Sequence, residues 1–187
     1  PITNDFFSPD ASYGTGIAGI GEEANGEHSV TTSDGLYLEA LTDLNNGDYL
    51  FASNNNLAND TSSYTTDDLT GSAELRYNKI WYLEKTNTPA ARLSFDFSEA
   101  SPDAQNPVNP SNYVLLHRNN LTGDFSVVKN ADGVQNGDQV YFVLSESDIE
   151  NGYYTLGTED QAESPLKGAE GRTWYTLISG DWDNWEI

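Results

Sequence analysis

The sequence predicts an all-β protein, an antiparallel β-sandwich of roughly nine strands joined by long polar loops. Short runs of aromatic and β-branched residues alternate with polar residues, and clusters of Asn, Asp, Gly and Pro separate these runs. Helix signals are scarce, and the strand–helix–strand rhythm of a parallel sheet is absent from the sequence. These observations together favour two packed antiparallel sheets.

Four strands are expected in the N-terminal half, at Gly35–Leu41, Asp48–Ala52, Lys79–Lys85 and Ala91–Phe97. The last of them alternates most clearly, because Leu93, Phe95 and Phe97 fall on one face of an extended chain. Its polar residues Arg92, Ser94 and Asp96 fall on the other face. A strand that buries one face and exposes the other has this pattern.

Five further strands are expected at Asn112–Arg118, Phe125–Lys129, Gln139–Leu144, Tyr153–Gly157 and Thr173–Ser179. The strand Asn112–Arg118 is nearly apolar on both faces, which is typical of a central strand. A short helical turn is expected around Ser145–Asn151, where Ser145 and Asp148 have the residue types of helix caps.

Two features concern turns and packing. The turn Asn45-Asn46-Gly47 precedes the second strand, and its Asn-Gly pair is a strong hairpin signal. Trp81 alternates with Leu83 on one face of its strand, so we expect it in the core.

The domain organisation follows from composition. A sandwich domain over residues 1–158 is expected, then a linker over 159–172, then a strand segment over 173–187. That segment either closes its own sheet, enters a neighbour's sheet or begins a further module. Residues 54–72 form a long polar stretch, and loops of such length tend to be functional or mobile.

Charge excludes several partners. The chain has 30 acidic and 8 basic residues and a formal net charge of -22. Such a surface repels phosphate backbones, so we expect no nucleic-acid partner. No apolar run reaches the roughly 18 residues that a membrane-spanning helix needs, so no membrane insertion is expected.

Catalysis has little support in the sequence, and we expect no enzyme. The chain has no cysteine and two histidines, His28 and His117, and it lacks the G-x-S-x-G nucleophile motif. Each histidine is better interpreted as an ordinary surface or strand residue. Paired carboxylates for sugar hydrolysis carry no weight here, because 30 acidic residues always contain pairs.

Calcium is the ion that the composition favours, since loops rich in Asp and Asn offer hard oxygen ligands. Three clusters qualify, with the candidate ligands Asp43, Asn45 and Asp48, then Asn130, Asp132 and Asp138, then Asp181, Asp183 and Glu186. None matches the full EF-hand loop. Each cluster has an alternative as turn chemistry, because Asn, Asp and Gly adopt left-handed and Asx turns.

Aromatic residues raise the alternative of carbohydrate binding, in which flat rings stack on sugar faces. Trp182 and Trp185 are the candidate ligand-binding residues, because they lie among Asp and Asn near the end of the chain. Packing under a following domain or a partner is the competing interpretation.

Five phrases carry a resemblance to a known kind of module: residues 19–22 (GIGE), 79–81 (KIW), 93–96 (LSFD), 113–118 (YVLLHR) and 152–157 (GYYTLG). In this order, over residues 16–158, the chain resembles a β-sandwich module of large multidomain surface proteins of Bacteroidetes-type bacteria exported by type IX secretion. Residues 174–185 resemble the start of a further module. The resemblance implies extracellular display, adhesion or assembly, and it assigns no catalytic residues.

The leading hypothesis is a non-catalytic structural or adhesive module of a secreted or cell-surface bacterial protein, stabilised by calcium. In one version Trp174, Leu177 and Ile178 enter the sheet of another copy or a neighbouring module, which would build filaments by strand exchange. The alternative is a carbohydrate-binding module of an exported enzyme, with glycans as partners. That alternative predicts an exposed row of two or three coplanar aromatic rings, either on one face or at the loop tips.

Overall fold

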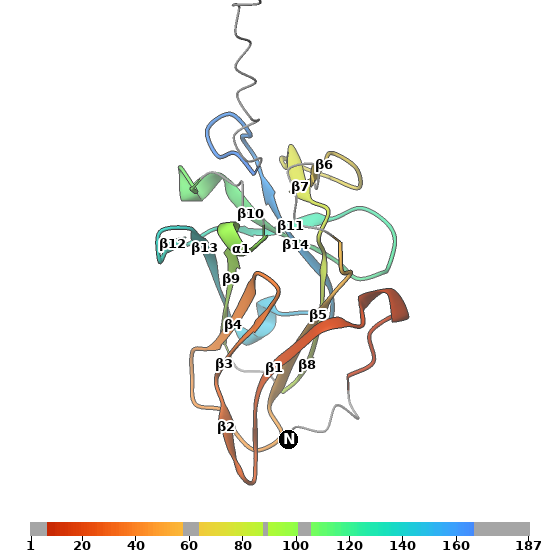
Figure 1. Ribbon diagram of the computed structural model, residues 1–187, viewed down its shortest axis with the longest axis vertical. Coiled ribbons are helices and arrows are strands. Elements are labelled where there is room, and N and C mark those ends of the chain that lie inside the picture. The colour runs from red at the N-terminus through yellow and green to blue at the C-terminus, as the bar shows by residue number, and fades with distance from the viewer. Residues whose placement is uncertain (1–6, 58–63, 88–89, 101–105, 167–187) are drawn as a thin grey trace, which may run out of the picture.

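The computed structural model describes residues 7–57, 64–87, 90–100 and 106–166 of the chain. Within these residues, fourteen strands are paired antiparallel into two sheets that pack face to face (Figure 1). The expected antiparallel β-sandwich is therefore confirmed.

The larger sheet has nine strands: β1 (Thr15–Glu23), β2 (Gly26–His28), β5 (Tyr49–Asn54), β6 (Tyr64–Thr65), β7 (Leu75–Tyr77), β8 (Trp81–Thr86), β10 (Tyr113–Arg118), β11 (Ser126–Asn130) and β14 (Gly152–Thr158). The main path runs β11-β10-β14-β8-β5-β1-β2, while β7 also pairs with β14 and β6 pairs with β7. Between β7 and β8 the ladder is interrupted, and there the Thr155 hydroxyl donates to the carbonyl of Lys79 at 2.8 Å. This bond satisfies a carbonyl that the ladder leaves open.

The smaller sheet has five strands: β3 (Val30–Ser33), β4 (Leu36–Ala40), β9 (Ala91–Asp96), β12 (Gly133–Gln135) and β13 (Gln139–Leu144). Their order is β12-β13-β9-β4-β3. One short α-helix, α1 (Phe97–Ala100), directly follows β9, and three 3-10 turns are η1 (Ala11–Tyr13), η2 (Pro110–Asn112) and η3 (Glu146–Asp148). η3 lies within the expected helical turn, and Ser145 and Asp148 form its capping box as the sequence predicts.

The main core lies between the sheets. Trp81 at its centre is fully buried, as expected, and its ring centroid lies 5.4 Å from that of Phe95 in an edge-on contact. Its indole nitrogen donates to the carbonyl of Ser33 at 2.6 Å, so the polar atom of the ring is satisfied. A second apolar cluster, which includes Phe125 and Tyr153, lies on the outer face of the larger sheet.

The expected strands compare closely with those observed. Eight of the nine fall on described residues, and all eight coincide with an observed strand within two residues at each end. The ninth, Thr173–Ser179, lies outside the described residues. Six observed strands were not expected from the sequence: β1, β2, β3, β6, β7 and β12.

The turn Asn45-Asn46-Gly47 does not form a hairpin between the strands around it. β4 and β5, which flank this turn, belong to different sheets, so the segment crosses from one layer to the other. Gly47 has a positive φ of 96°, and its amide donates to the carbonyl of Glu22 in β1. The Asn-Gly signal thus marks a left-handed turn, while its hairpin interpretation is wrong.

The described part of the expected linker, residues 159–166, packs against the domain. Leu166 is fully buried in the main core, and Ser164 is fully buried and donates its hydroxyl to the carbonyl of Val108 at 2.7 Å. The long polar stretch 54–72 is described only in part. There β6 pairs with β7, and Leu69 forms a bridge with Phe125.

Candidate functional site

The outer face of the five-stranded sheet carries the most developed set of polar and aromatic side chains. Along β4, β9 and β13 the residues that enter the core alternate with residues that point away from it. We call the outward set the sheet platform and define it as Tyr37, Arg92, Ser94, Asp96, Gln135, Gln139 and Tyr141. The alternation of Arg92, Ser94 and Asp96 in the sequence already places them on this face.

Strand register brings two tyrosines into one row on the platform. Tyr37 of β4 and Tyr141 of β13 are both direct cross-strand partners of Ser94 in β9. Neighbouring strands lie about 4.8 Å apart, so the two tyrosine backbones are separated by about 10 Å across the strands. Both tyrosines are half-buried, whereas Ser94 between them is small and 2% exposed. The two rings therefore stand higher on the face than the residue between them.

Hydrogen bonds fix the polar side chains between and beside the rings. Gln135 donates to the Ser94 hydroxyl at 3.1 Å and to the Gln139 side-chain oxygen at 3.2 Å. Gln139 in turn donates to Asp96 at 2.9 Å, and Asp96 also accepts from the Ser98 hydroxyl at 3.0 Å. Ser94, Asp96 and Gln139 are between 2% and 8% exposed although they lie on the outer face. The network is therefore rigid before any ligand arrives.

Tyr141 is positioned from both sides. A methyl group added to Gly133, its cross-strand partner, would lie 2.9–3.1 Å from atoms of the Tyr141 side chain, so the ring covers the glycine. On the other side the guanidinium carbon of Arg92 lies 5.2 Å from the ring centroid. Arg92 is itself held by Glu39 at 2.7 Å. Within the described residues, the Tyr141 hydroxyl has no hydrogen-bond partner.

Tyr37 has a different neighbour, the helix α1 that follows β9. Burial raises the pKa of Tyr37, and the hydrogen-bonded Glu99 of α1 raises it further. The carboxylates of Asp96 and Asp138 act in the same direction. The Tyr37 hydroxyl therefore stays protonated, and the carboxylate hydrogen-bonded to it is that of Glu99.

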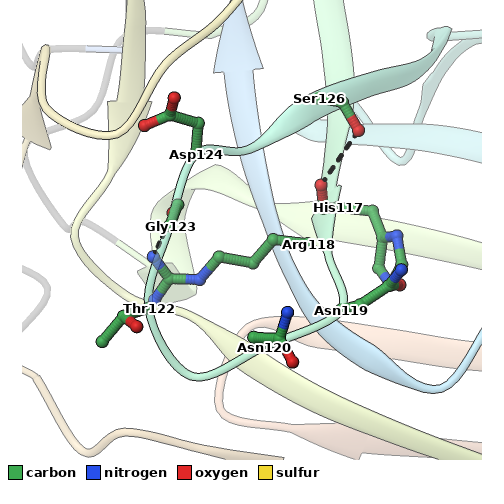
Figure 2. A pocket seen from close by; sticks show the side chains of 8 residues that line it. All are labelled: His117, Arg118, Asn119, Asn120, Thr122, Gly123, Asp124 and Ser126. Carbon is green, nitrogen blue, oxygen red and sulfur yellow. Dashed lines mark hydrogen bonds between the residues drawn. The ribbon is translucent and has the colours of Figure 1, made fainter.

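A polar hollow of about 270 Å³ lies at the other sheet, under the loop that joins β10 and β11 (Figure 2). Its lining comes from the loop and from the strand ends that the loop joins: His117, Arg118, Asn119, Asn120, Thr122, Gly123, Asp124 and Ser126. Figure 2 shows the Arg118 side chain lying across the loop, where its Nη1 donates to the Gly123 carbonyl at 2.8 Å. This bond ties the loop to β10.

Arg118 and Arg76 form a paired contact with one aromatic ring. Their guanidinium carbons lie 4.4 Å and 5.0 Å from the centroid of Phe125, and both groups approach the same Asp68 carboxylate, at 3.4 Å and 3.2 Å. Burial lowers the pKa of Arg76, whereas Asp68 raises it. The ordinary pKa of an arginine is so high that Arg76 remains charged. The hydrogen bonds of both arginines go to protein groups, so this cluster fastens the loop and the segment around Asp68 to the sheet.

His117 lines one side of the hollow and packs against Tyr154. Its ring centroid is 4.5 Å from that of Tyr154, and its Nε2 is 3.4 Å from the carbonyl of Asn151. Burial lowers the pKa of His117. This is the environment of a packed strand histidine. The hollow is lined almost entirely by polar side chains, whereas ligand sites are usually lined by apolar and aromatic ones, so the sheet platform is the better candidate.

The first predicted calcium cluster is used as a turn. Asp48 is 7% exposed, and its carboxylate accepts from the backbone of Asn45 at 2.8 Å and from the Asn45 side chain at 3.1 Å. Asp43 is exposed on the same connection.

The second predicted cluster is divided by a hairpin. Asn130 and Asp132 precede β12, whereas Asp138 follows it at the turn, at the opposite end of the β12–β13 pairing. Asp132 is paired with Lys129 at 2.7 Å, and Asn130 donates to the carbonyl of Ser111 at 2.7 Å. The structure therefore does not bring these three candidate ligands together.

The remaining predicted site residues lie outside the described residues. They are the calcium candidates Asp181, Asp183 and Glu186, the sugar-stacking candidates Trp182 and Trp185, and the strand-exchange residues Trp174, Leu177 and Ile178. Within the described ranges, no three acidic or histidine side chains gather in a way that could hold a metal ion. Bound calcium and strand exchange both stay predictions.

No helix in the described part of the chain is long and apolar enough to span a membrane. Comparison with known proteins gives no further indication, because no family model, curated protein or solved structure matches the chain.

Proposed function

We propose that this chain is a non-catalytic, adhesive β-sandwich module that binds a carbohydrate on the sheet platform. The observation that carries the proposal is the row formed by Tyr37, Ser94 and Tyr141. Two aromatic rings flank a small polar residue at a separation comparable with the length of a disaccharide. A glycan laid across β4, β9 and β13 would place a sugar ring beside each tyrosine.

The surrounding hydrogen-bond network favours a sugar over an apolar ligand. Gln135, Gln139 and Asp96 present amide and carboxylate groups whose geometry is already fixed by bonds to one another. Sugar hydroxyl groups donate and accept hydrogen bonds, and a preformed site loses little conformational freedom on binding. The sequence predicted such an aromatic row for a carbohydrate-binding module, although on Trp182 and Trp185.

Location at the cell surface or outside the cell is part of the same proposal. The strongly acidic composition and the resemblance to modules of exported multidomain surface proteins support it. An adhesive module of this kind would attach a larger protein to glycans on another cell, on a matrix or on a nutrient polymer. The Asp96 carboxylate accepts hydrogen bonds from Gln139 and Ser98, so it serves to hold the side chains of the platform in place.

The test begins with a glycan array and continues with isothermal titration against the best ligand. Tyr37→Ala and Tyr141→Ala should each weaken binding by about tenfold, since an aromatic contact contributes roughly 0.5–1.5 kcal/mol beyond its area. Val143→Ala is the matched control, because Val143 lies on the same face of β13 two residues from Tyr141 and is 38% exposed. Its affinity should stay within a factor of about two.

Circular dichroism and melting curves establish that each variant is folded. The proposal is contradicted if no glycan binds, or if both tyrosine variants keep the affinity of the unmodified chain.

A further inference from the structure

The carboxylates around the sheet platform restrict the glycans that it can accept, provided that the platform is the glycan site proposed above. Asp96 lies within the platform, and Glu99 is hydrogen-bonded to Tyr37 at one end of the row. Asp138 directly precedes Gln139 of the platform, and its charge also raises the pKa of Tyr37. Glu39 lies beside Arg92 at a second position on the face. A ligand on the row would thus meet negative charge beside its centre and at its Tyr37 end.

Arg92, the arginine on this face, does not neutralise the negative charge of these carboxylates. Arg92 Nη1 donates to the Glu39 carboxylate at 2.7 Å and to the Gln135 side-chain oxygen at 3.4 Å. Its Nε is buried without a partner, so that atom is closed to a ligand. An arginine paired in this way contributes little net charge to an approaching anion. The whole chain adds to the effect with its formal net charge of -22.

We infer that the platform selects uncharged glycans and discriminates against glycans that carry carboxylate, sulfate or phosphate groups. The discrimination has two physical parts. A carboxylate on this face can only accept hydrogen bonds, which sugar hydroxyl groups can donate and ionised ligand groups cannot. Like charges at short distance also repel, and the repulsion is strongest at low ionic strength.

The experiment uses matched pairs of polymers that differ only in charge. A β-glucan, a xylan and a mannan are each immobilised beside their own carboxymethylated derivative, and binding of the full chain is measured by biolayer interferometry at low and high salt. We expect a neutral member to bind at least tenfold more tightly than its derivative at low salt. The difference should narrow as salt is added.

A charge-removing variant separates a local effect from the repulsion of the whole surface. Asp138→Asn keeps the size of the side chain and its backbone bond to Phe97 but removes one charge that acts on Tyr37. It should raise the affinity for the carboxymethylated polymer by about two- to fivefold at low salt and leave the neutral polymer unchanged. Asp124→Asn, a carboxylate on the β10–β11 loop, is the control and should change neither.

The outcomes distinguish the inference from the function on which it rests. Tighter binding of the neutral polymers, with a gain for the carboxymethylated polymer in Asp138→Asn alone, supports both. Equal or tighter binding of the carboxymethylated members, or equal gains in the two variants, overturns the inference and leaves glycan binding standing. Absence of binding to any of the six polymers and to the glycan array overturns both.

Discussion

Three of the eight basic side chains, Arg76, Lys79 and Arg118, are at most 9% exposed. Each lies over an aromatic ring, with the Lys79 amine 5.7 Å from the centroid of Trp81 and the two arginines against Phe125. These cations therefore stabilise the interior of the fold. A flat guanidinium can pack against an aromatic ring and still donate to hydrogen-bond acceptors. The consequence is a surface that is more uniformly negative than the sequence count implies.

Asp68 is the residue on which this arrangement depends. Asp68→Asn removes the charge that faces both arginines but keeps a residue type that tolerates the positive φ of 56° at this position. Because Asp68 is half-exposed, we expect a moderate loss of about 1–3 kcal/mol in the free energy of unfolding, measured by urea denaturation.

The control for this variant is the preceding residue. Asp67 contacts the Arg76 Nε through its backbone carbonyl, so Asp67→Asn should cost less than about 0.5 kcal/mol. Equal losses in the two variants would show that the arginine pair does not need the Asp68 carboxylate.

At the scale of strands, the sequence located those strands in which apolar and polar residues alternate. β9 and β13 combine apolar residues at every second position, and both were located from the sequence within one residue. β1 was not expected, because Gly16, Gly19 and Gly21 give it little apolar character of its own. Its pattern depends on the neighbouring strand, since the Phe51 ring lies over Gly19 and the Tyr49 ring lies over Gly21.

Only part of the sheet platform could be predicted from the sequence. Alternation put Arg92, Ser94 and Asp96 on one outer face, and the structure places them there. The sequence could not show that Tyr37 and Tyr141 flank Ser94, because these residues are far apart along the chain and only the strand order unites them. The clusters of Asn and Asp were ambiguous for the opposite reason, since turn chemistry and calcium ligation use the same residue types.

At the scale of the whole molecule, the charge of -22 opposes the compact state. Raising NaCl from about 0.01 M to about 1 M shortens the screening length roughly tenfold, so we expect a gain of about 1 kcal/mol, or roughly 2–4 °C in Tm. Calcium chloride at the same ionic strength should raise Tm further, because an ion bound to the native state stabilises it by mass action. EDTA should reverse only that additional rise, and equal curves for the two salts would contradict the calcium prediction.

The central claim is that a glycan binds across β4, β9 and β13. The most direct test is a titration of the ¹⁵N-labelled chain with neutral gluco-, xylo- and manno-oligosaccharides, followed by amide chemical shifts. The account predicts that the largest shift changes cluster on the three central strands around Tyr37, Ser94 and Tyr141. Changes that cluster instead on the loop from Asn119 to Asp124, or no changes with any of the three sets, would contradict it.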